Sequence, residues 1–248
     1  MTGTLVARGL GKSFDDLEVL AGVDLEARSG QVTAVLGPSG CGKSTLLRVL
    51  AGFEAATTGE VLLDGVRLTG PSPDRGMVAQ AGGLFPWLTL RDNLAFGPRA
   101  ARRPDHEVRA VVEELLSATG LDGFAGALPK QLSGGMRQRA AIAQVLANRP
   151  PVLLLDEPFG ALDAQTRLRM HEWLLALLTD RATTVVLVTH DVEEALLLGD
   201  RLCLLSNRPA RVVDDLPVPF GRGRGRAVLA EPEFVAMKAA VLERVLAA

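Results

Sequence analysis

The chain has 248 residues and a formal net charge of −2, so its overall charge gives no general reason to expect nucleic-acid binding. The length suits one or two domains with a sizeable hydrophobic core. Hydrophobic residues make up 48% of the chain and the mean hydropathy is +0.21, which is apolar for a soluble protein. No apolar run approaches the roughly 18 residues that a membrane-spanning helix needs, so we expect a chain that does not cross a membrane.

The cysteines and the N-terminal residues indicate the compartment. Cys41 and Cys203 are the only two cysteines, and they form no CxxC pair or histidine cluster for zinc. The sequence leaves a single disulfide between them open, although Cys41 lies inside a motif that argues against it. Residues 1–14 lack the apolar core of a signal peptide. We therefore expect a reducing, cytoplasmic environment.

Strand-like and helix-like segments alternate along the chain, which is typical of an α/β fold with a largely parallel sheet. Gln31–Leu36 predicts a strand, and Ser44–Leu50 predicts the helix that follows it and ends near Gly52. Val61–Leu63 predicts a strand that enters a hairpin turn at Asp64-Gly65.

The middle of the chain changes character. From about residue 89 to 149 the pattern is helical, with Pro104 near the start of one helix and Gly120 at its end. Strand character returns at Val152–Leu155 and Thr183–Val188, which are apolar enough to be central parallel strands. The sequence therefore predicts one α/β core that is interrupted by a helical insertion.

The C-terminal segment differs in composition from the rest. Residues 221–226 read GRGRGR, which we interpret as a solvated flexible linker in preference to a lipid or RNA contact. Residues 232–246 predict a short amphipathic helix. Its apolar residues are Phe234, Val241, Leu242 and Val245.

The strongest motif lies between the predicted strand at 31–36 and the helix after it. It satisfies the pattern G-x-x-x-x-G-K-[ST] and consists of Gly37, Pro38, Ser39, Gly40, Cys41, Gly42, Lys43, Ser44 and Thr45. The glycines let the backbone curl so that N–H groups converge on phosphate oxygens, and the helix adds its positive N-terminal end. Lys43 supplies a charge for the β- and γ-phosphates, and Ser44 a hydroxyl for Mg²⁺. A chance glycine loop is the alternative, but the flanking strand and helix favour nucleotide binding.

A second motif points to the reaction. Asp156 and Glu157 directly follow the apolar run Val152–Leu155, at the end of a predicted strand, where α/β sheets place ligands. Asp156 would hold Mg²⁺ through water, and Glu157 would polarise a water for attack on the γ-phosphate. The alternative is an acidic pair on the surface, which is a weak explanation in a chain with a P-loop upstream.

A third motif indicates the family. Residues 132–139 read LSGGMRQR and place Ser133 as an N-cap ahead of Gly134 and Gly135, so that backbone N–H groups are exposed to an anion. An ordinary capped helix would gain nothing from these two glycines. The motif resembles the LSGGQ signature of ATP-binding cassette (ABC) ATPases. The resemblance implies a head-to-tail homodimer, in which the signature of one subunit closes over ATP on the P-loop of the other.

Three further residues match ABC motifs in family order. The resemblance implies that Gln80 touches Mg²⁺ and the attacking water, at the point where the core meets the helical insertion. It implies that Asp163 lies in the loop that crosses the dimer seam, and that His190 contacts the γ-phosphate. A lone histidine is more often structural, but its place in this series favours the catalytic interpretation.

The resemblance also implies an adenine site and covers residues 5 to about 213. Phe14 occupies the position whose aromatic ring stacks on adenine, and Val19 would line the same face. Because the chain has no tyrosine, Phe14 would do this by stacking alone. Packing of Phe14 into the core is the alternative.

Three segments resemble the ATPases of nitrate, sulfonate and taurine importers. Phe85 and Trp87 would cap the small core of the helical insertion on the surface where this family docks its permease. Ala79 replaces a usual aromatic residue, and residues 81–83 are looser than the family norm, which weakens the inference about the substrate. The segments are residues 74–80 (DRGMVAQ), 84–89 (LFPWLT) and 159–167 (FGALDAQTR).

The sequence therefore predicts an α/β fold of the P-loop NTPase (RecA-like) type, with an antiparallel β subdomain and an inserted α-helical subdomain. We expect a single ABC ATPase domain. Its parts would be the nucleotide-binding core with the β subdomain at residues 1–87 and 150–215, the helical signature subdomain at 88–149, and a C-terminal tail and helix at 216–248.

The resemblance implies the ATP-hydrolysing subunit of a bacterial importer, peripheral on the cytoplasmic face of the inner membrane. Its cofactors would be ATP and Mg²⁺, and its cargo a small anion such as an aliphatic sulfonate, taurine or nitrate. The expected partners are a second copy of the chain, integral membrane permease subunits and, indirectly, a substrate-binding protein, but no nucleic acid. The alternatives are an ABC ATPase for another small solute (for example a vitamin precursor), one for export, and a soluble ABC ATPase without a transport role.

Overall fold

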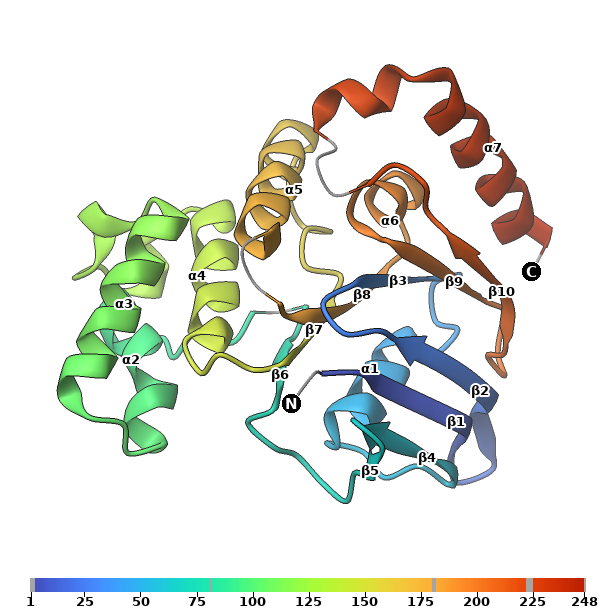
Figure 1. Ribbon diagram of the computed structural model, residues 1–248, viewed down its shortest axis with the longest axis horizontal. Coiled ribbons are helices and arrows are strands. Elements are labelled where there is room, and N and C mark those ends of the chain that lie inside the picture. Colours follow the sequence, from blue (N-terminus) through green and yellow to red (C-terminus); the bar gives the residue numbers. More distant parts are fainter. Residues whose placement is uncertain (1–2, 81, 180–181, 222–224, 248) are drawn as a thin grey trace.

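A parallel sheet forms the centre of the computed structural model, which describes residues 3–80, 82–179, 182–221 and 225–247 (Figure 1). The strand order is β10-β9-β3-β8-β7-β6, with β10 antiparallel to β9 and the other neighbours parallel. Every residue of β3, β7 and β8 is buried, as expected for central strands covered on both faces. The predicted α/β core is confirmed. The strands are β3 (Val32–Leu36), β6 (Arg75–Val78), β7 (Val152–Asp156), β8 (Thr184–Thr189), β9 (Arg201–Leu205) and β10 (Val212–Pro217).

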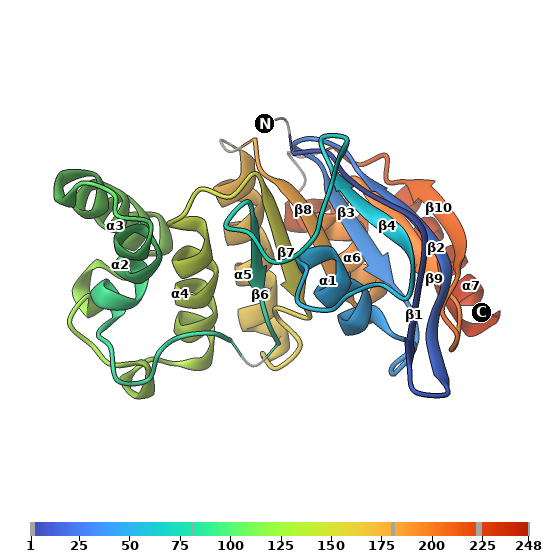
Figure 2. The ribbon, with the colours of Figure 1, turned by 90° about the horizontal axis from the view of Figure 1, so that it is seen from below.

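A smaller antiparallel sheet packs beside the first one (Figure 2). Its order is β2-β1-β4-β5, and helix α1 (Lys43–Ala51) shares one hydrophobic core with both sheets. The predicted turn at Asp64-Gly65 is confirmed, because both residues have positive φ and Leu63 pairs with Val66. The strands are β1 (Leu5–Phe14), β2 (Leu17–Ala27), β4 (Thr58–Leu63) and β5 (Val66–Arg67).

The helical insertion lies at one end of the molecule (Figure 1). Pro104 directly precedes α3, and Gly120 ends that helix in the left-handed conformation that favours glycine, as the sequence predicted. Apolar side chains of α2, α3 and α4 share a core with the face of the parallel sheet that lies opposite α1. The helices are α2 (Leu90–Ala100), α3 (Asp105–Thr119), the short 3₁₀ turns η1 (Asp122–Phe124) and η2 (Pro129–Gln131), and α4 (Gly134–Leu146).

Helices α5 (Ala164–Thr179), α6 (Val192–Leu198) and α7 (Pro232–Ala247) complete the fold, with a 3₁₀ turn η3 (Arg226–Ala230) before α7. Helix α7 packs on α6 through buried Phe234 and Val241. Leu242 is half-exposed, so the predicted apolar face holds for Phe234 and Val241 but not for Leu242. The arginine-glycine run at 221–226 falls largely on residues 222–224, which lie outside the described residues.

The two cysteines are free and buried, so the disulfide that the sequence left open does not form. Burial raises the pKa of the Cys203 thiol to about 12. Within the part of the chain that the structure describes, no helix combines the length and the apolar character that crossing a membrane requires.

The packing of α7 predicts a large difference between two neighbouring residues. Phe234 is 1% exposed and its ring centroid lies 5.2 Å from that of Phe220, whereas Val235 is 53% exposed. We expect Phe234→Ala to lower the free energy of unfolding by about 3 kcal/mol, since it removes a buried ring, and Val235→Ala to change it by less than about 0.5 kcal/mol. Urea denaturation measures both, and equal effects would contradict this packing.

Candidate active site

The glycine-rich loop joins the end of β3 to the start of α1, as the sequence predicted. Gly40 and Gly42 have φ values of 78° and 123°, which an L side chain rarely adopts. At Gly42 a Cβ atom would also lie 2.8 Å from Val19 Cγ1, so the loop could not keep its path with a larger residue. The loop therefore brings its backbone N–H groups to the N-terminus of α1, where an anion binds favourably.

Lys43 and Ser44 begin α1 and face different partners. The Lys43 ammonium is buried and donates to the carbonyl oxygens of Gly37 and Pro38, both at 2.8 Å. An ammonium group has three N–H donors, so it can also reach a phosphate that enters the loop. The Ser44 hydroxyl donates to Asp156 Oδ1 at 3.0 Å, which joins the loop to the end of β7.

Asp156 is a buried carboxyl group at the carboxyl end of β7. Burial raises its pKa, and the hydrogen bond from Ser44 offsets part of that effect. Neighbouring Glu157 raises the pKa further, while Lys43 lowers it. A carboxylate in this position would be stabilised by a bound cation, and with the Ser44 hydroxyl it offers the oxygen ligands that Mg²⁺ prefers.

Glu157 is the meeting point of three segments that are far apart in sequence. Its Oε2 atom lies 3.1 Å from His190 Nδ1 and accepts a hydrogen bond from Gln80 Nε2 at 3.4 Å. Gln80 follows β6 and His190 follows β8, so the ends of three adjacent parallel strands converge here. Glu157 itself has a φ of 44°, an uncommon backbone conformation that is often found at functional sites. The structure thus brings together Gln80, Glu157 and His190.

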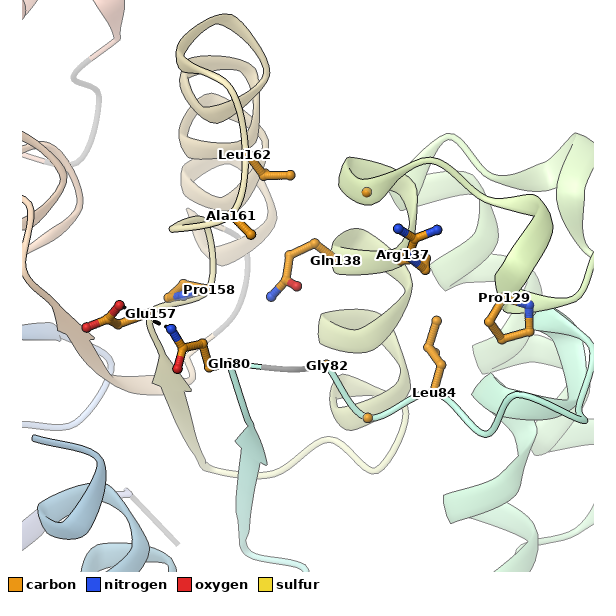
Figure 3. Close-up of a pocket in the computed structure, with 12 residues that line it drawn as sticks. Gln80, Gly82, Leu84, Pro129, Arg137, Gln138, Glu157, Pro158, Ala161 and Leu162 are labelled. Carbon is orange, nitrogen blue, oxygen red and sulfur yellow. Dashed lines mark hydrogen bonds between the residues drawn. The ribbon is translucent and has the colours of Figure 1, made fainter.

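The signature residues begin α4 on the far side of a cavity of about 500 Å³ (Figure 3). Ser133 is the N-cap, and its hydroxyl accepts a hydrogen bond from the backbone N–H of Met136 at 3.3 Å. Gly134 lines this cavity together with Gln80 and Glu157. The described lining of this cavity includes no residue of the glycine-rich loop, and none of the described contacts joins residues 133–135 to that loop.

Asp163 and Phe14 make none of the described contacts with the Ser44–Asp156 pair. Asp163 precedes α5, and hydrogen bonds from Thr166 lower its pKa. Phe14 ends β1, is 41% exposed, and has the Lys12 ammonium 4.6 Å from its ring centroid. Val19 is buried against Gly42, so it supports the P-loop. The adenine site at Phe14 and Val19 stays a prediction.

The structure adds a residue that sequence reasoning missed. Arg208, in the loop between β9 and β10, donates to the Gly40 carbonyl oxygen of the P-loop. It lies 168 positions from Gly40 in the chain, in a segment without a periodic or motif signal. Pairing of β9 with β3 brings this loop to the site, and only the tertiary fold shows that.

Fold and site together define a class of protein. A P-loop, a Ser–Asp pair whose oxygens could hold a cation, and a carboxylate held by a glutamine and a histidine are the parts expected of a P-loop ATPase. The second glycine-bearing helix N-terminus, at Ser133, distinguishes this chain from a minimal nucleotide-binding fold.

Comparison with known proteins gives the family. The model of the ABC transporter family matches residues 20–160. The taurine import ATP-binding protein TauB of Roseobacter denitrificans is 48% identical over 206 residues, which cover 83% of this chain and 77% of that protein. The aliphatic sulfonates import ATP-binding protein SsuB 2 of Burkholderia lata is 45% identical over 234 residues, which cover 94% of this chain and 82% of that protein.

A solved structure agrees with these relatives. A bacterial ABC transporter cassette in dimeric form matches with a TM-score of 0.77 at 32% identity, over 88% of this chain and 100% of the cassette. The chain belongs to the ABC transporter family and is an ATPase of that family.

Proposed function

We propose that the chain is the ATP-hydrolysing subunit of a bacterial importer for a small anion such as taurine, an aliphatic sulfonate or nitrate. The observation that carries the proposal is the Glu157 carboxylate, which lies beside the Ser44–Asp156 pair and faces both Gln80 and His190. The names of the relatives from Roseobacter denitrificans and Burkholderia lata support import of a sulfonate.

In the proposed reaction, Glu157 is the general base. Its carboxylate accepts a proton from the water that attacks the γ-phosphate. His190 and Gln80 hold that carboxylate from two sides, so its direction is fixed before the nucleotide arrives. Lys43 and the backbone N–H groups of the P-loop stabilise the negative charge that spreads over the phosphate oxygens.

The residues present fit a bound Mg²⁺. No group of three or more His, Cys, Asp or Glu side chains in the described chain could hold a metal by itself, so phosphate oxygens would complete the coordination. Ser44 and Asp156 would hold the ion, with Gln80 as the further ligand. The ion would neutralise charge on the β- and γ-phosphates when it is bound.

The positions of the two glycine-bearing helix N-termini favour a homodimer. No described contact joins them within one chain, which supports an arrangement in which a nucleotide on the P-loop meets Ser133 of a second copy. The dimeric form of the solved cassette supports this arrangement. Asp163, exposed at the start of α5, would then lie at the seam between the two copies.

Exposed aromatic side chains mark the surface where a permease would dock, on the cytoplasmic face of the inner membrane. The ring centroid of Phe85 lies 5.7 Å from that of Trp87 and 4.4 Å from that of Phe96. Trp87 is 73% exposed, so little of its ring is used by the chain itself. An exposed aromatic cluster of this kind favours a protein partner.

We expect Trp87→Ala to impair coupling and to spare the isolated ATPase. Because Trp87 contributes little to the fold, the purified chain should hydrolyse ATP at the wild-type rate. Truncation of a central interface aromatic costs about 2 kcal/mol or more, so the affinity for permease vesicles should fall about 30-fold. Phe124→Ala, another exposed aromatic on the helical insertion, serves as the control. Unchanged permease binding by Trp87→Ala would contradict the assignment of this surface.

The proposed function as a whole is tested by reconstitution. The chain is reconstituted in liposomes with a candidate permease and receptor, and ATP hydrolysis is measured with taurine, an alkanesulfonate or nitrate. Stimulation by one of these anions together with its uptake supports the proposal. Uptake of an uncharged solute instead, or transport out of the lumen that contains ATP, would replace it with one of the alternatives named above.

A further inference from the structure

A buried histidine lies between the segments that carry Glu157 and His190. His171, on α5, is 3% exposed, and its Nε2 atom lies 3.0 Å from Oε1 of Glu194, which is also 3% exposed. We assign Nε2 as the donor, which is the tautomer that places the ring N–H toward the carboxylate oxygen. Glu194 is in the first turn of α6, the helix that begins just after His190.

The same imidazole contacts the segment that carries Glu157. The ring centroids of His171 and Phe159 are 5.3 Å apart, with an angle of 60° between the ring planes. Phe159 is fully buried and follows Glu157 by two residues. His171 therefore packs on one catalytic segment and is hydrogen-bonded to the other.

The Glu157 and His190 segments are therefore connected in two ways, through the proposed catalytic pair and through His171. Glu157 and His190 meet at 3.1 Å on one side, and His171 joins their two segments on the other. A second link, between Arg167 and Asp191 at 3.1 Å, runs in parallel but is partly exposed, so water screens it. The backbone N–H of Glu157 also donates to the Val188 carbonyl oxygen at 2.9 Å, which joins the ends of the two strands. Among the side-chain links described, the His171–Glu194 pair is the buried one, where a hydrogen bond fixes position most strongly.

Burial of this polar pair is hard to explain by stability alone. Two apolar side chains would fill the same space without desolvating a carboxylate, and such replacements are often neutral or stabilising. A hydrogen bond differs from apolar packing because it selects one direction and one distance.

We propose that His171 is a positioning residue for hydrolysis, which holds the Glu157 and His190 segments at the distance that the reaction needs. The proposal rests on the roles of Glu157 and His190 under the proposed function. His171 touches neither of these two side chains in the contacts described, so it acts through Phe159 and Glu194.

The test begins with two substitutions at His171. His171→Phe keeps a ring for Phe159 but removes the donor, and we expect kcat to fall about 10-fold with KM for ATP changed less than about twofold, because misplaced catalytic groups slow chemistry more than binding. His171→Gln places an amide N–H near the position of Nε2, and we expect it to recover kcat to within about threefold of the wild-type value.

A double variant separates positioning from stability. His171→Phe alone leaves a buried carboxylate unpaired, and Glu194→Leu alone leaves a buried imidazole unpaired, so both should lower Tm. The double variant leaves no polar group without its partner, so Tm should recover while kcat stays about 10-fold below the wild-type value. Leu174→Ala, at a buried apolar position of the same helix, is the control and should lower Tm without lowering kcat per ATP-binding molecule.

Recovery of both Tm and kcat in the double variant would overturn the inference, because the pair would then be only structural. Wild-type kcat in His171→Phe would overturn it as well. Glu157→Gln is measured beside these variants, because it distinguishes a failure of the proposed function from a failure of the positioning role. If it hydrolyses ATP normally, the assigned general base is wrong; if it is inactive while His171→Phe is fully active, only the positioning role fails.

Discussion

Glu157→Gln is expected to bind ATP, to stop hydrolysing it, and to accumulate as a dimer with nucleotide trapped between the copies. An amide cannot accept the proton of the attacking water, and loss of a general base lowers kcat by about 100- to 10,000-fold. The fold should survive, because glutamine has the same shape and can still pair with His190 and Gln80, the two partners of Glu157.

The substitution also changes the electrostatics of the closed state. It removes a negative charge beside the place where the γ-phosphate would lie, so the ATP-bound dimer should be more stable than that of the wild type. Phosphate release and gel filtration with Mg-ATP measure the two effects. Glu243→Gln, on an exposed part of α7, removes the same charge elsewhere and should behave as the wild type. Phosphate release at the wild-type rate by Glu157→Gln would refute the assignment.

The sequence could predict the elements whose signal is local. The strand, glycine loop and helix around Lys43 follow from residues that are adjacent in the chain, and β7 with its terminal Asp156 is a continuous apolar run. The turn at Asp64-Gly65 and the end of α3 at Gly120 likewise depend on the φ preferences of single residues. These features need no knowledge of what packs against them.

The contacts at the site could not be predicted in the same way. Family resemblance placed Gln80 and His190 in the active site, but their convergence on a single carboxylate oxygen depends on strand order, which brings β6, β7 and β8 side by side. Arg208 and His171 were missed, since neither lies in a motif and each has a partner far away in sequence. Leu242 was assigned to an apolar helix face, yet the packing of α7 on α6 leaves it half-exposed.

Lys43→Ala tests the other half of the site, because it should remove nucleotide binding and not only hydrolysis. The Lys43 ammonium is buried between the carbonyl oxygens of Gly37 and Pro38, where it can bridge the loop and a phosphate. Two of its three N–H donors are used by these carbonyl oxygens, so one is left for a phosphate oxygen. A hydrogen bond to a charged group contributes about 1.5–3 kcal/mol, so its loss predicts a rise in Kd for ATP of about 10- to 100-fold.

Lys43→Ala should therefore block nucleotide binding, whereas Glu157→Gln should block hydrolysis after binding. Comparing the two variants tests both parts of the site. Lys43→Ala should stay a monomer at ATP concentrations that turn Glu157→Gln into a dimer, because without bound nucleotide nothing bridges the P-loop of one copy and Ser133 of the other. Lys130→Ala, at an exposed lysine of the short η2 turn, removes the same charge outside the P-loop and should bind ATP normally in a fluorescence titration. If Lys43→Ala binds ATP as tightly as this control does, the loop between β3 and α1 is not the phosphate site. The convergence at Glu157 would then need another explanation, since a general base is useful only where a phosphate is held within reach of its water.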